Sequence, residues 1–323
     1  MKAIVQDVYG SPDVLRLADI DTPEPGDDDV LVQMRAAGVD AGVWHLMAGQ
    51  PYLLRLGFGL RGPKVRVRGR DVAGIVSAVG RNVTRFRPGD EVFGTAPAGS
   101  YAEYACTREN RLEPKPANLS FEQAAAVPVS ACAALHGLRD AGRLQQGQAV
   151  LILGAGGGVG TFAVQLAKAF GATVTGVCSA AKADLVRSIG ADHVIDYARE
   201  DFADGARRYD LILDIAGNNP LTRLRRALAP GGTLVIAGGE GGGRVFGGID
   251  RQLRASLLSP FTRQKLRTFV SAERQEDLRD LRGLIEAGQL TPVIDRTYPL
   301  VEAADAIRRL RAGQARGKLV VTV

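Results

Sequence analysis

Hydrophobic and polar positions follow three successive patterns along the chain. Up to about residue 117, short runs such as VLVQMRAAGV, GIVSAVG and YAEYACT alternate with turns rich in proline, glycine and aspartate. Runs of this length between tight turns are typical of strands in an antiparallel sheet or barrel. We therefore expect the first part of the chain to form a mainly antiparallel β domain.

After PKPANLS the pattern changes to helices and then to an alternation of strands and helices. Ser120 is expected to cap a helix through FEQAAAV, which Pro128 should break or kink. From Ala149 onward, the apolar strands VLIL, TVTGVC, LILDIAG and TLVIAG are separated by amphipathic helices such as VGTFAVQLAKAFG and LTRLRRALA. Short strands without polar positions are buried on both faces, so this order predicts a doubly wound parallel sheet of the α/β class.

The tail returns to the first pattern, with LRTFVS and KLVVTV as expected strands and EDLRDLRGLIEAG and EAADAIRRLRAG as expected helices. A terminal strand commonly completes a sheet begun elsewhere in the chain. We therefore predict a catalytic β domain at 1–122, a nucleotide-binding domain at 123–263 and a segment at 264–323 that rejoins the first domain. The cleft between the domains is the expected active site.

The composition is that of an ordinary globular protein, with 46% hydrophobic and 24% charged residues. A net charge of +6 is compatible with nucleic-acid binding, but the densest basic region, 251–282, also carries four acidic residues. No zinc-finger spacing and no strand motif that mixes aromatic and basic residues accompanies this region. We therefore expect no nucleic-acid partner.

Three scattered cysteines favour a reducing compartment over a disulfide framework. The most apolar run, 124–135, is interrupted by Pro128 and is too short to span a bilayer. The first residues, MKAIVQDVYG, alternate like a strand and lack the apolar core of a signal peptide. The expected protein is soluble, cytoplasmic and without a membrane partner.

A glycine-rich turn, GAGGGVG at 154–160, follows the strand AVLIL and opens a helix. Glycine lets the backbone approach a pyrophosphate closely, and the helix N-terminus offers N–H groups and the positive end of the helix dipole. The strict G-x-G-x-x-G motif is not met because Ala155 occupies its first position, but the strand–turn–helix context still predicts a dinucleotide site. The expected contacts from this turn are Gly156, Gly157, Gly158, Val159 and Gly160.

The second strand of the predicted sheet lacks the acid that usually binds the adenosine ribose. In VTGVCSAAK the strand ends at Cys178 and Ser179, and Lys182 follows closely. A carboxylate would repel a 2′-phosphate, whereas a hydroxyl at Ser179 and an ammonium at Lys182 favour one. Tyr197, after the next strand, offers a phenol to the same phosphate. These residues predict NADP(H) as the cofactor over NAD(H).

Six motifs give the chain a resemblance to a known family: GRDVAGIVSAVGRNVTRFRPGDEVFG, GSYAEYA, AAAVPVSACAAL, VLILGAGGGVGTFAVQLAKAFGA, LVRSIGADHVIDY and ARGKLVVTV. With them the chain resembles the medium-chain dehydrogenase/reductase superfamily, in its zinc-independent quinone oxidoreductase-like branch. The resemblance covers nearly the whole chain. It implies a GroES-like catalytic domain, a Rossmann domain, NADPH bound between them and a homodimer. In quinone oxidoreductases a Lys and a Tyr at the positions of Lys182 and Tyr197 hold the 2′-phosphate.

The resemblance also provides a test for zinc. Zinc-dependent relatives carry ligands at the positions of Asp40 and Arg70, and a third near Val129 or Ser130. A guanidinium has no free lone pair, and a tetrahedral zinc needs at least three protein ligands. The short segment TAPAGS also leaves no room for the four cysteines of a structural zinc lobe. We therefore expect no metal, and a pairing of Arg70 with Asp71 in its place.

Without a Lewis acid, the expected reaction is hydride transfer from NADPH to a quinone or an α,β-unsaturated carbonyl, because conjugation spreads the developing charge. The resemblance makes Asp40 and His45 the candidate catalytic residues. Quinone reductases usually carry Asn at the position of Asp40, and zinc alcohol dehydrogenases carry a proton-relay His at that of His45. Position in the fold adds further expected cofactor contacts: Gly217, Ala237 and Gly238 at strand ends, and Phe261 and Lys318 from the tail.

Two other functions remain open from the sequence. One is an NADP(H)-binding sensor or interaction protein with little turnover, because Asp40, Gly42 and Ala133 leave few polar groups near the expected nicotinamide. The other is an NADP-dependent alcohol dehydrogenase, which the lost zinc ligands disfavour. A short-chain dehydrogenase is disfavoured as well, since neither Tyr101 nor Tyr197 has a lysine four residues later.

Overall fold

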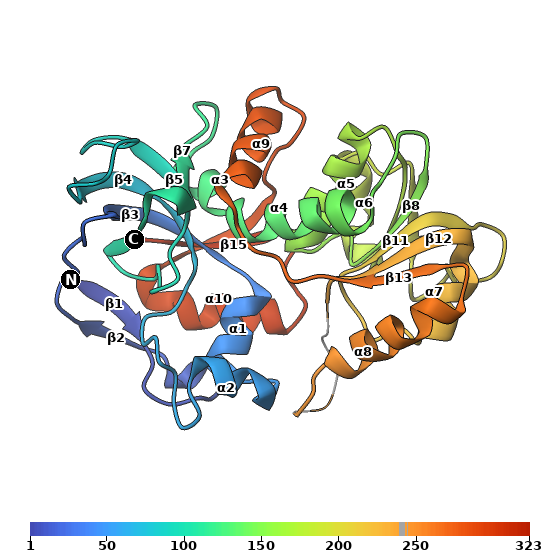
Figure 1. Cartoon of the computed structure of the whole chain (residues 1–323), viewed down its shortest axis with the longest axis horizontal. Coiled ribbons are helices and arrows are strands. Elements are labelled where there is room, and N and C mark those ends of the chain that lie inside the picture. Colours follow the sequence, from blue (N-terminus) through green and yellow to red (C-terminus); the bar gives the residue numbers. More distant parts are fainter. Residues whose placement is uncertain (239–242, 244) are drawn as a thin grey trace. The chain divides into compact units, whose positions relative to one another are not determined.

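The computed structural model describes residues 1–238, 243 and 245–323, and the chain forms two compact units (Figure 1). Unit 1 comprises Met1–Cys132 and Glu273–Val323, and unit 2 comprises Ala133–Ala272. Antiparallel strands dominate the first and parallel strands the second. This architecture confirms the predicted fold class.

Unit 1 contains a two-stranded sheet, β1-β2, and a seven-stranded sheet in the order β14-β15-β3-β4-β5-β7, with β6 also paired to β3. The strands are β1 (Lys2–Val5), β2 (Arg16–Asp19), β3 (Asp29–Val39), β4 (Asp71–Val79), β5 (Glu91–Thr95), β6 (Tyr104–Arg108), β7 (Leu112–Pro114), β14 (Ile294–Pro299) and β15 (Lys318–Thr322). Its helices are α1 (Ala41–Ala48), α2 (Arg55–Phe58), α3 (Phe121–Ala125), α9 (Gln275–Glu286) and α10 (Ala303–Arg311).

The tail strand β15 is an integral part of this sheet. It pairs antiparallel with β3, with Leu319 opposite Val39, and parallel with β14. Leu319, Val320 and Val321 are fully buried. The last residues of the chain therefore complete a core that the first residues begin.

The predicted helix boundaries near residue 120 are confirmed. Ser120 caps α3 with a capping box, in which its hydroxyl accepts from the N–H of Gln123 and the Gln123 side chain accepts from the N–H of Ser120. α3 ends at Ala125, and Pro128 begins α4 (Pro128–Leu135). Pro128 thus stands at a first helical position, where its missing N–H costs nothing.

Unit 2 contains a six-stranded sheet in the order β10-β9-β8-β11-β12-β13, in which every neighbouring pair is parallel. The strands are β8 (Ala149–Leu153), β9 (Thr173–Cys178), β10 (His193–Asp196), β11 (Tyr209–Asp214), β12 (Leu228–Ile236) and β13 (Lys265–Thr268). The principal helices are α5 (Gly158–Ala169), α6 (Ala183–Ser188), α7 (Leu221–Ala227) and α8 (Ile249–Leu258).

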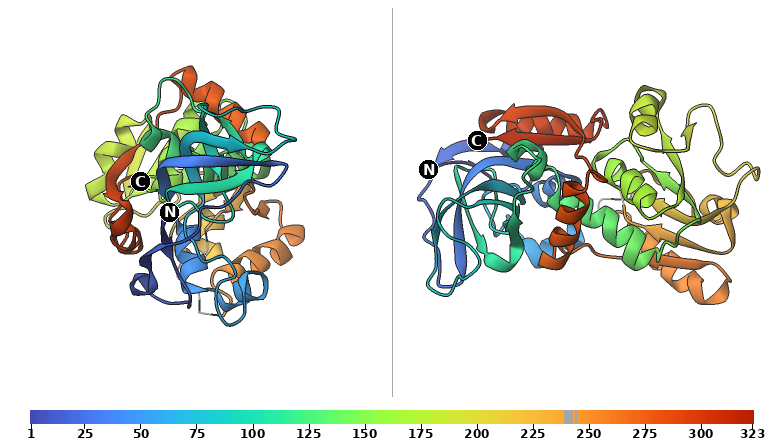
Figure 2. Two further views of the ribbon diagram at one scale, coloured as in Figure 1. Left: turned by 90° about the vertical axis from the view of Figure 1, so that its left-hand side faces the viewer. Right: turned by 90° about the horizontal axis from the view of Figure 1, so that it is seen from above.

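Helices cover both faces of this parallel sheet, α5 and α6 on one face and α7 and α8 on the other (Figure 2). Val150, Leu151 and Ile152 of β8 are accordingly fully buried. The strand order reverses its direction beside β8, whose neighbours are β9 and β11. In open parallel sheets, ligands bind at the carboxyl ends of the strands at such a reversal, and here the reversal lies at the end of β8.

One predicted element lies elsewhere than expected. The strand around Leu266 belongs to the tail in the sequence interpretation, yet β13 pairs with β12 as the edge strand of unit 2. Its four residues pair through backbone groups, and Leu266 packs into the core of this unit. A short strand of this kind carries no sequence signal for the sheet that it joins.

Candidate functional site

The glycine-rich turn connects β8 to α5 with close backbone contacts. Gly154 has a φ of +89°, and a Cβ there would lie 2.6 Å from the Cβ of Ala216. A Cβ on Gly160 would lie 2.1 Å from the carbonyl oxygen of Gly154, so α5 packs directly on the turn. Gly157 is the N-cap residue of α5 and has no side chain with which to bond the N–H groups of the first turn. The first N–H groups of α5 thus suit a pyrophosphate.

The departure from the strict motif has a local explanation. Ala155 is fully buried and its N–H donates to the carbonyl of Val177, 3.0 Å away. Its methyl faces β9 at Gly176, where an added Cβ would lie only 2.9 Å from it. The alanine in the turn therefore fits because the neighbouring strand carries a glycine.

The residues predicted to bind a 2′-phosphate come together at the ends of β9 and β10. Cys178 is the register partner of Asp196, so Ser179 and Tyr197 follow two adjacent parallel strands. The N–H of Tyr197 donates to the carbonyl of Cys178 at 3.2 Å. The Tyr197 side chain is 62% exposed, which leaves its ring open to a ligand.

Lys182 lies against the glycine turn itself. A Cβ on Gly156 would be 2.8 Å from the Cβ of Lys182 and 2.9 Å from its Cδ. The aliphatic part of the Lys182 side chain therefore covers the turn. In the chain, Lys182 directly precedes α6 as its N-cap residue. This contact joins the predicted phosphate-binding lysine to the predicted pyrophosphate turn.

The charge at this strand end is mixed. Burial raises the pKa of the Cys178 thiol, Asp196 raises it further, and Lys182 and Arg187 lower it. Asp196 is an acid that the sequence interpretation missed, although it directly precedes Tyr197 in HVIDY. Its carboxylate accepts from the N–H of Ala198 at 3.1 Å and lies 3.7 Å from Arg199. These partners offset its negative charge beside the candidate phosphate site.

The segments after β11 and β12 adjoin the glycine turn. The N–H groups of Ala237 and Gly238 both donate to the carbonyl of Asp214, at 2.9 and 3.2 Å. A Cβ on Gly238 would lie 2.0 Å from the carbonyl oxygen of Ile215, so these two segments touch. Gly217 follows with a φ of +93°. The three predicted nicotinamide-side residues thus share the carboxyl edge of the sheet with the turn.

Phe261 does not lie at this edge, and its predicted cofactor contact is corrected. It precedes β13 and lines a hollow of about 520 Å³ together with Leu228 and Pro230, which begin β12. In a parallel sheet, the residues that enter the strands lie at the amino edge, opposite the carboxyl edge where the glycine turn follows β8. Phe261 is 85% exposed there.

Lys318 is also placed differently from its predicted role. It is 1% exposed, and its Nζ lies 3.3 Å from Oδ2 of Asp71 and 3.0 Å from Oγ of Ser130. Its ammonium is thus engaged inside unit 1. We correct its assignment from cofactor contact to partner of a buried carboxylate.

The predicted pairing of Arg70 with Asp71 is wrong. Nη2 of Arg70 lies 2.6 Å from Oε2 of Glu273, whereas Asp71 faces Lys318 and accepts from the N–H of Val129 at 2.9 Å. Each of the two residues finds a partner about two hundred positions or more later in the sequence, which local spacing could not indicate.

These residues do not fit a zinc ion. Where zinc-dependent enzymes need at least three neutral or anionic donors, unit 1 places the cations of Arg70 and Lys318. Neither cation has a lone pair to donate. The pKa of Asp71 is raised to about 6: burial is the main cause, Asp40 and Glu273 add to the rise, and Lys318 and the Val129 N–H oppose it.

Asp40 and His45 both belong to α1: Asp40 is its N-cap residue, and His45 lies within the helix. Oδ1 of Asp40 accepts from the N–H of Val43 at 3.2 Å and so caps the helix. Oδ2 of Asp40 is buried and has no hydrogen-bond partner within the described part of the chain. Nδ1 of His45 lies 2.8 Å from the carbonyl oxygen of Gln50, which requires the proton on Nδ1 and leaves Nε2 for another partner.

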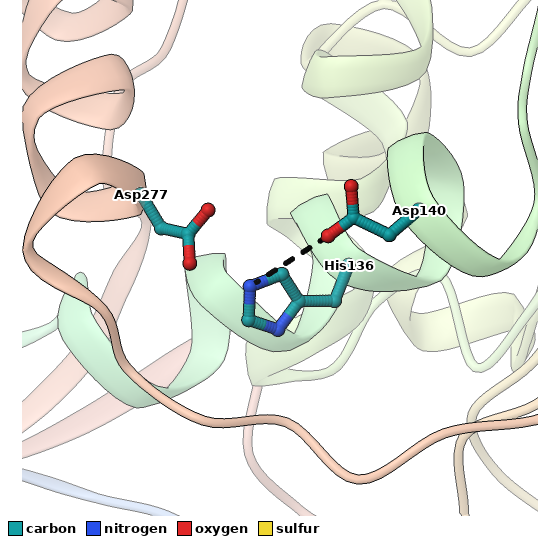
Figure 3. A group of neighbouring side chains, drawn as sticks. All are labelled: His136, Asp140 and Asp277. Atoms are coloured by element: carbon teal, nitrogen blue, oxygen red, sulfur yellow. Dashed lines mark ion pairs between the residues drawn. The ribbon is translucent and has the colours of Figure 1, made fainter.

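His136, a histidine without a predicted role, has structural partners. Figure 3 shows it beside Asp140, and their Nε2 and Oδ2 atoms are 3.9 Å apart. Both residues lie in the π-helical segment His136–Ala141. Nδ1 of His136 is 3.1 Å from Oγ of Ser271, and its ring meets the edge of Phe269 with centroids 6.5 Å apart.

Known proteins share this fold and these motifs. The family model described as "Alcohol dehydrogenase GroES-like domain" matches residues 26–117, and the one described as "Zinc-binding dehydrogenase" matches residues 189–321. The chloroplastic NADPH-dependent alkenal/one oxidoreductase of Arabidopsis thaliana is 33% identical over 335 residues, which cover 99% of this chain and 79% of that protein.

Two solved structures are similar over the whole chain. The quinone oxidoreductase of Coxiella burnetii superposes with a TM-score of 0.85 and 31% identity, covering 100% of this chain and 99% of that one. An NAD-dependent alcohol dehydrogenase superposes with a TM-score of 0.86 and 29% identity, covering 100% of both chains. Within the described residues, no helix combines the length and apolarity needed to cross a membrane.

Proposed function

The chain belongs to the medium-chain dehydrogenase/reductase superfamily, in its quinone oxidoreductase-like branch, and is an NAD(P)H oxidoreductase. On this premise we propose that it transfers hydride from NADPH to a quinone or an α,β-unsaturated carbonyl, and that it does so without zinc. The NADPH-dependent relative in Arabidopsis thaliana and the quinone oxidoreductase of Coxiella burnetii support these two acceptor classes.

The observation that carries the cofactor preference is the convergence of Ser179, Lys182 and Tyr197 beside the glycine turn. Lys182 packs on Gly156, and Ser179 and Tyr197 follow paired strands. A hydroxyl, an ammonium and a phenol can each donate to a phosphate dianion, and charge-assisted hydrogen bonds of this kind are the strong ones. Asp196 has its own partners at Ala198 and Arg199, which moderates its repulsion of the phosphate.

Zinc independence is supported by two cations in unit 1: Arg70 stands at the position of one of the relatives' ligands, and Nζ of Lys318 lies 3.0 Å from Oγ of Ser130, near the position of another. Arg70 and Lys318 each have a carboxylate partner, so charge is balanced there by side chains. Without a divalent ion, an unactivated ketone or alcohol is a poor substrate, because no Lewis acid stabilises the alkoxide. Conjugated acceptors need no such ion.

When bound, NADPH would supply the hydride for the reduction. The turn at 154–160 would hold its pyrophosphate on the N–H groups of α5, and the segments after β11 and β12 would orient its reactive half. The reduced acceptor then needs one proton. The Gln50 carbonyl holds one ring proton on Nδ1 of His45. Nε2 can therefore deliver the proton that the acceptor needs only from the imidazolium form of the ring, and water then returns a proton to Nε2. Oδ2 of Asp40 can accept a hydrogen bond from the acceptor or from water.

Replacement of Lys182 by alanine tests the cofactor preference. We expect the ratio of kcat/KM for NADPH to kcat/KM for NADH, measured with 1,4-benzoquinone, to fall roughly 10–100-fold, since a charged hydrogen bond is lost. Lys168→Ala is the matched control, because Lys168 lies on α5 and its Nζ faces Asp192 at 2.8 Å. An unchanged ratio in Lys182→Ala, or better use of NADH by the unaltered protein, contradicts the proposal.

A panel of acceptors separates the enzyme from its alternatives. Turnover of quinones and enones with NADPH supports the proposed reaction, and turnover of simple alcohols with NADP⁺ supports an alcohol dehydrogenase. Tight NADPH binding without turnover of any acceptor supports a sensor.

We further propose that the protein is a cytoplasmic homodimer. β13 is the edge strand of the sheet in unit 2, and Leu253 and Leu257 on the adjoining helix α8 are 56% and 73% exposed. Apolar side chains one helical turn apart, beside a strand edge that no described residue pairs with, favour contact with a second copy. Cys106, Cys132 and Cys178 form no disulfide, as suits a reducing compartment.

A further inference from the structure

A buried arginine on α8 contacts both segments that follow the central strands of unit 2. Arg251 is only 7% exposed. Its Nη1 lies 2.7 Å from Oδ2 of Asp214 and donates to the carbonyl of Asn219 at 3.1 Å. Its Nη2 donates to the carbonyl of Gly238, also at 3.1 Å. One guanidinium thus joins the end of β11, the segment after it and the segment after β12.

The groups that Arg251 contacts surround the proposed nicotinamide side of the cofactor site. Gly217 lies between Asp214 and Asn219, and Gly238 directly follows Ala237. The N–H groups of Ala237 and Gly238 donate hydrogen bonds to the Asp214 carbonyl, and these bonds hold only the start of the segments that follow β11 and β12. Arg251 adds the link from Asn219 to Gly238, and a planar guanidinium fixes the direction of both bonds.

The ion pair is a poor device for stability alone. Oδ1 of Asp214 and Nε of Arg251 are buried and have no hydrogen-bond partner within the described residues. Burial raises the pKa of Asp214 to about 7, although Arg251 works against this rise. A buried ion pair with unsatisfied atoms is commonly no more stabilising than apolar side chains of similar volume. The arrangement of the Arg251–Asp214 ion pair is therefore not explained by a contribution to stability.

We infer that Arg251 is a positioning residue for hydride transfer, which fixes the segments after β11 and β12 as one surface for the nicotinamide half of the cofactor. This inference rests on the proposed NADPH-dependent function. Arg251 acts through the backbone that it holds, so its loss should affect the reactive half of the cofactor and spare the adenosine half at Ser179, Lys182 and Tyr197.

The experiment compares a whole cofactor with its adenosine half. The double variant Arg251→Met with Asp214→Leu removes both buried charges together, which avoids leaving one unpaired. Arg251→Lys retains a charge opposite Asp214 but cannot donate to both carbonyls in one plane. Arg254→Met on the same helix is the control, because the Arg254 side chain is 76% exposed. Each protein is titrated with NADPH and with 2′,5′-ADP, and kcat is measured with 1,4-benzoquinone.

We expect the double variant and Arg251→Lys to bind 2′,5′-ADP within about twofold of the unaltered protein, while the Kd for NADPH rises and kcat falls, each by about tenfold. Arg254→Met should change neither. Unchanged NADPH binding and kcat in the double variant would overturn the inference. A parallel loss of 2′,5′-ADP and NADPH binding would also overturn it, by showing a merely structural role. Failure of the unaltered protein to bind NADPH would instead refute the proposed function.

Discussion

At the scale of single residues, buried charge in unit 1 gathers around Asp71. This carboxyl is fully buried, and Lys318 and the Val129 N–H are its partners. Tyr101 donates to the carbonyl of Gly38 at 3.1 Å, and burial together with Asp40 and Asp71 raises the pKa of its phenol. The phenol therefore stays neutral. When Asp71 is protonated, its carboxyl no longer neutralises the charge of Lys318. The protonation of Asp71 therefore affects the electrostatics of all these buried residues.

Stability should depend on pH through Asp71. Its pKa is about 6 in the folded chain against 3.8 in a model peptide, so the folded state retains a proton that the unfolded state loses between these values. This contribution is fully present below pH 4 and is lost as the pH rises to 6, by about 3 kcal/mol at ~1.4 kcal/mol per pH unit. Asp71→Asn should flatten the change in urea midpoint between pH 4 and 6.

Asp214, with a pKa of about 7, should also lower the unfolding free energy as the pH rises, over a range that extends to pH 7. This second decrease should remain in Asp71→Asn. Asp184→Asn is the exposed control, since the Asp184 side chain is 98% accessible. If Asp71→Asn follows the same pH profile as the unaltered chain and this control, the assigned titration is wrong.

Residues that act with sequence neighbours were predictable, and residues that act with distant ones were not. Ser179, Lys182 and Tyr197 follow strands whose apolar pattern fixes their place at one edge of the sheet, and the structure brings them together. Lys318 and Arg70 form pairs with partners 247 and 203 positions away, and no local pattern encodes such a pair. Both of these pairs were therefore missed in the sequence analysis.

At the scale of elements, the glycine turn depends on close contact between backbone groups. Where the turn contacts β9, the turn carries Ala155 and the strand carries Gly176. The glycine that this contact needs can therefore lie in the strand instead of in the turn. The predicted strands and helices around this turn are all present, because apolar strands and amphipathic helices have distinct periods. Phe261 was misplaced in the sequence analysis because the strand that follows it, β13, was not assigned to the sheet of unit 2. β13 has only four residues and one buried side chain, Leu266, so its pattern is weak.

Replacement of Gly160 by alanine should disrupt this contact. The new Cβ would lie 2.1 Å from the Gly154 carbonyl and 2.8 Å from the backbone of Ala155, so α5 must move away from the turn. We expect a loss of about 1–3 kcal/mol in unfolding free energy, and at least about tenfold weaker NADPH binding.

Gly283→Ala on α9 is the control for this substitution, because nothing lies within 4 Å of the added Cβ. It should be neutral or stabilise by up to about 1 kcal/mol, as alanine is the better helix former. Calorimetry and NADPH fluorescence titration measure both variants. Wild-type stability and affinity in Gly160→Ala would refute the role of this contact.

At the scale of the whole molecule, the proposed homodimer makes a prediction about assembly. Leu253→Glu with Leu257→Glu places two charges on the exposed face of α8. Burying them against a second copy would be unfavourable, so light scattering should show a shift from dimer to monomer at micromolar concentration. Leu56→Glu, at a 71% exposed position in unit 1, is the control and should remain dimeric. A monomeric unaltered protein, or a dimeric double variant, contradicts the proposed interface.

The pairing of β15 with β3 sets an order for folding during synthesis. Unit 2 is one continuous segment, 133–272, and can complete its sheet while later residues are still being translated. Unit 1 must hold an exposed strand edge on β3 until residues 318–322 leave the ribosome. Because nascent domains with open edges are prone to aggregate, the earlier half of this chain is the part that needs chaperone protection the longest.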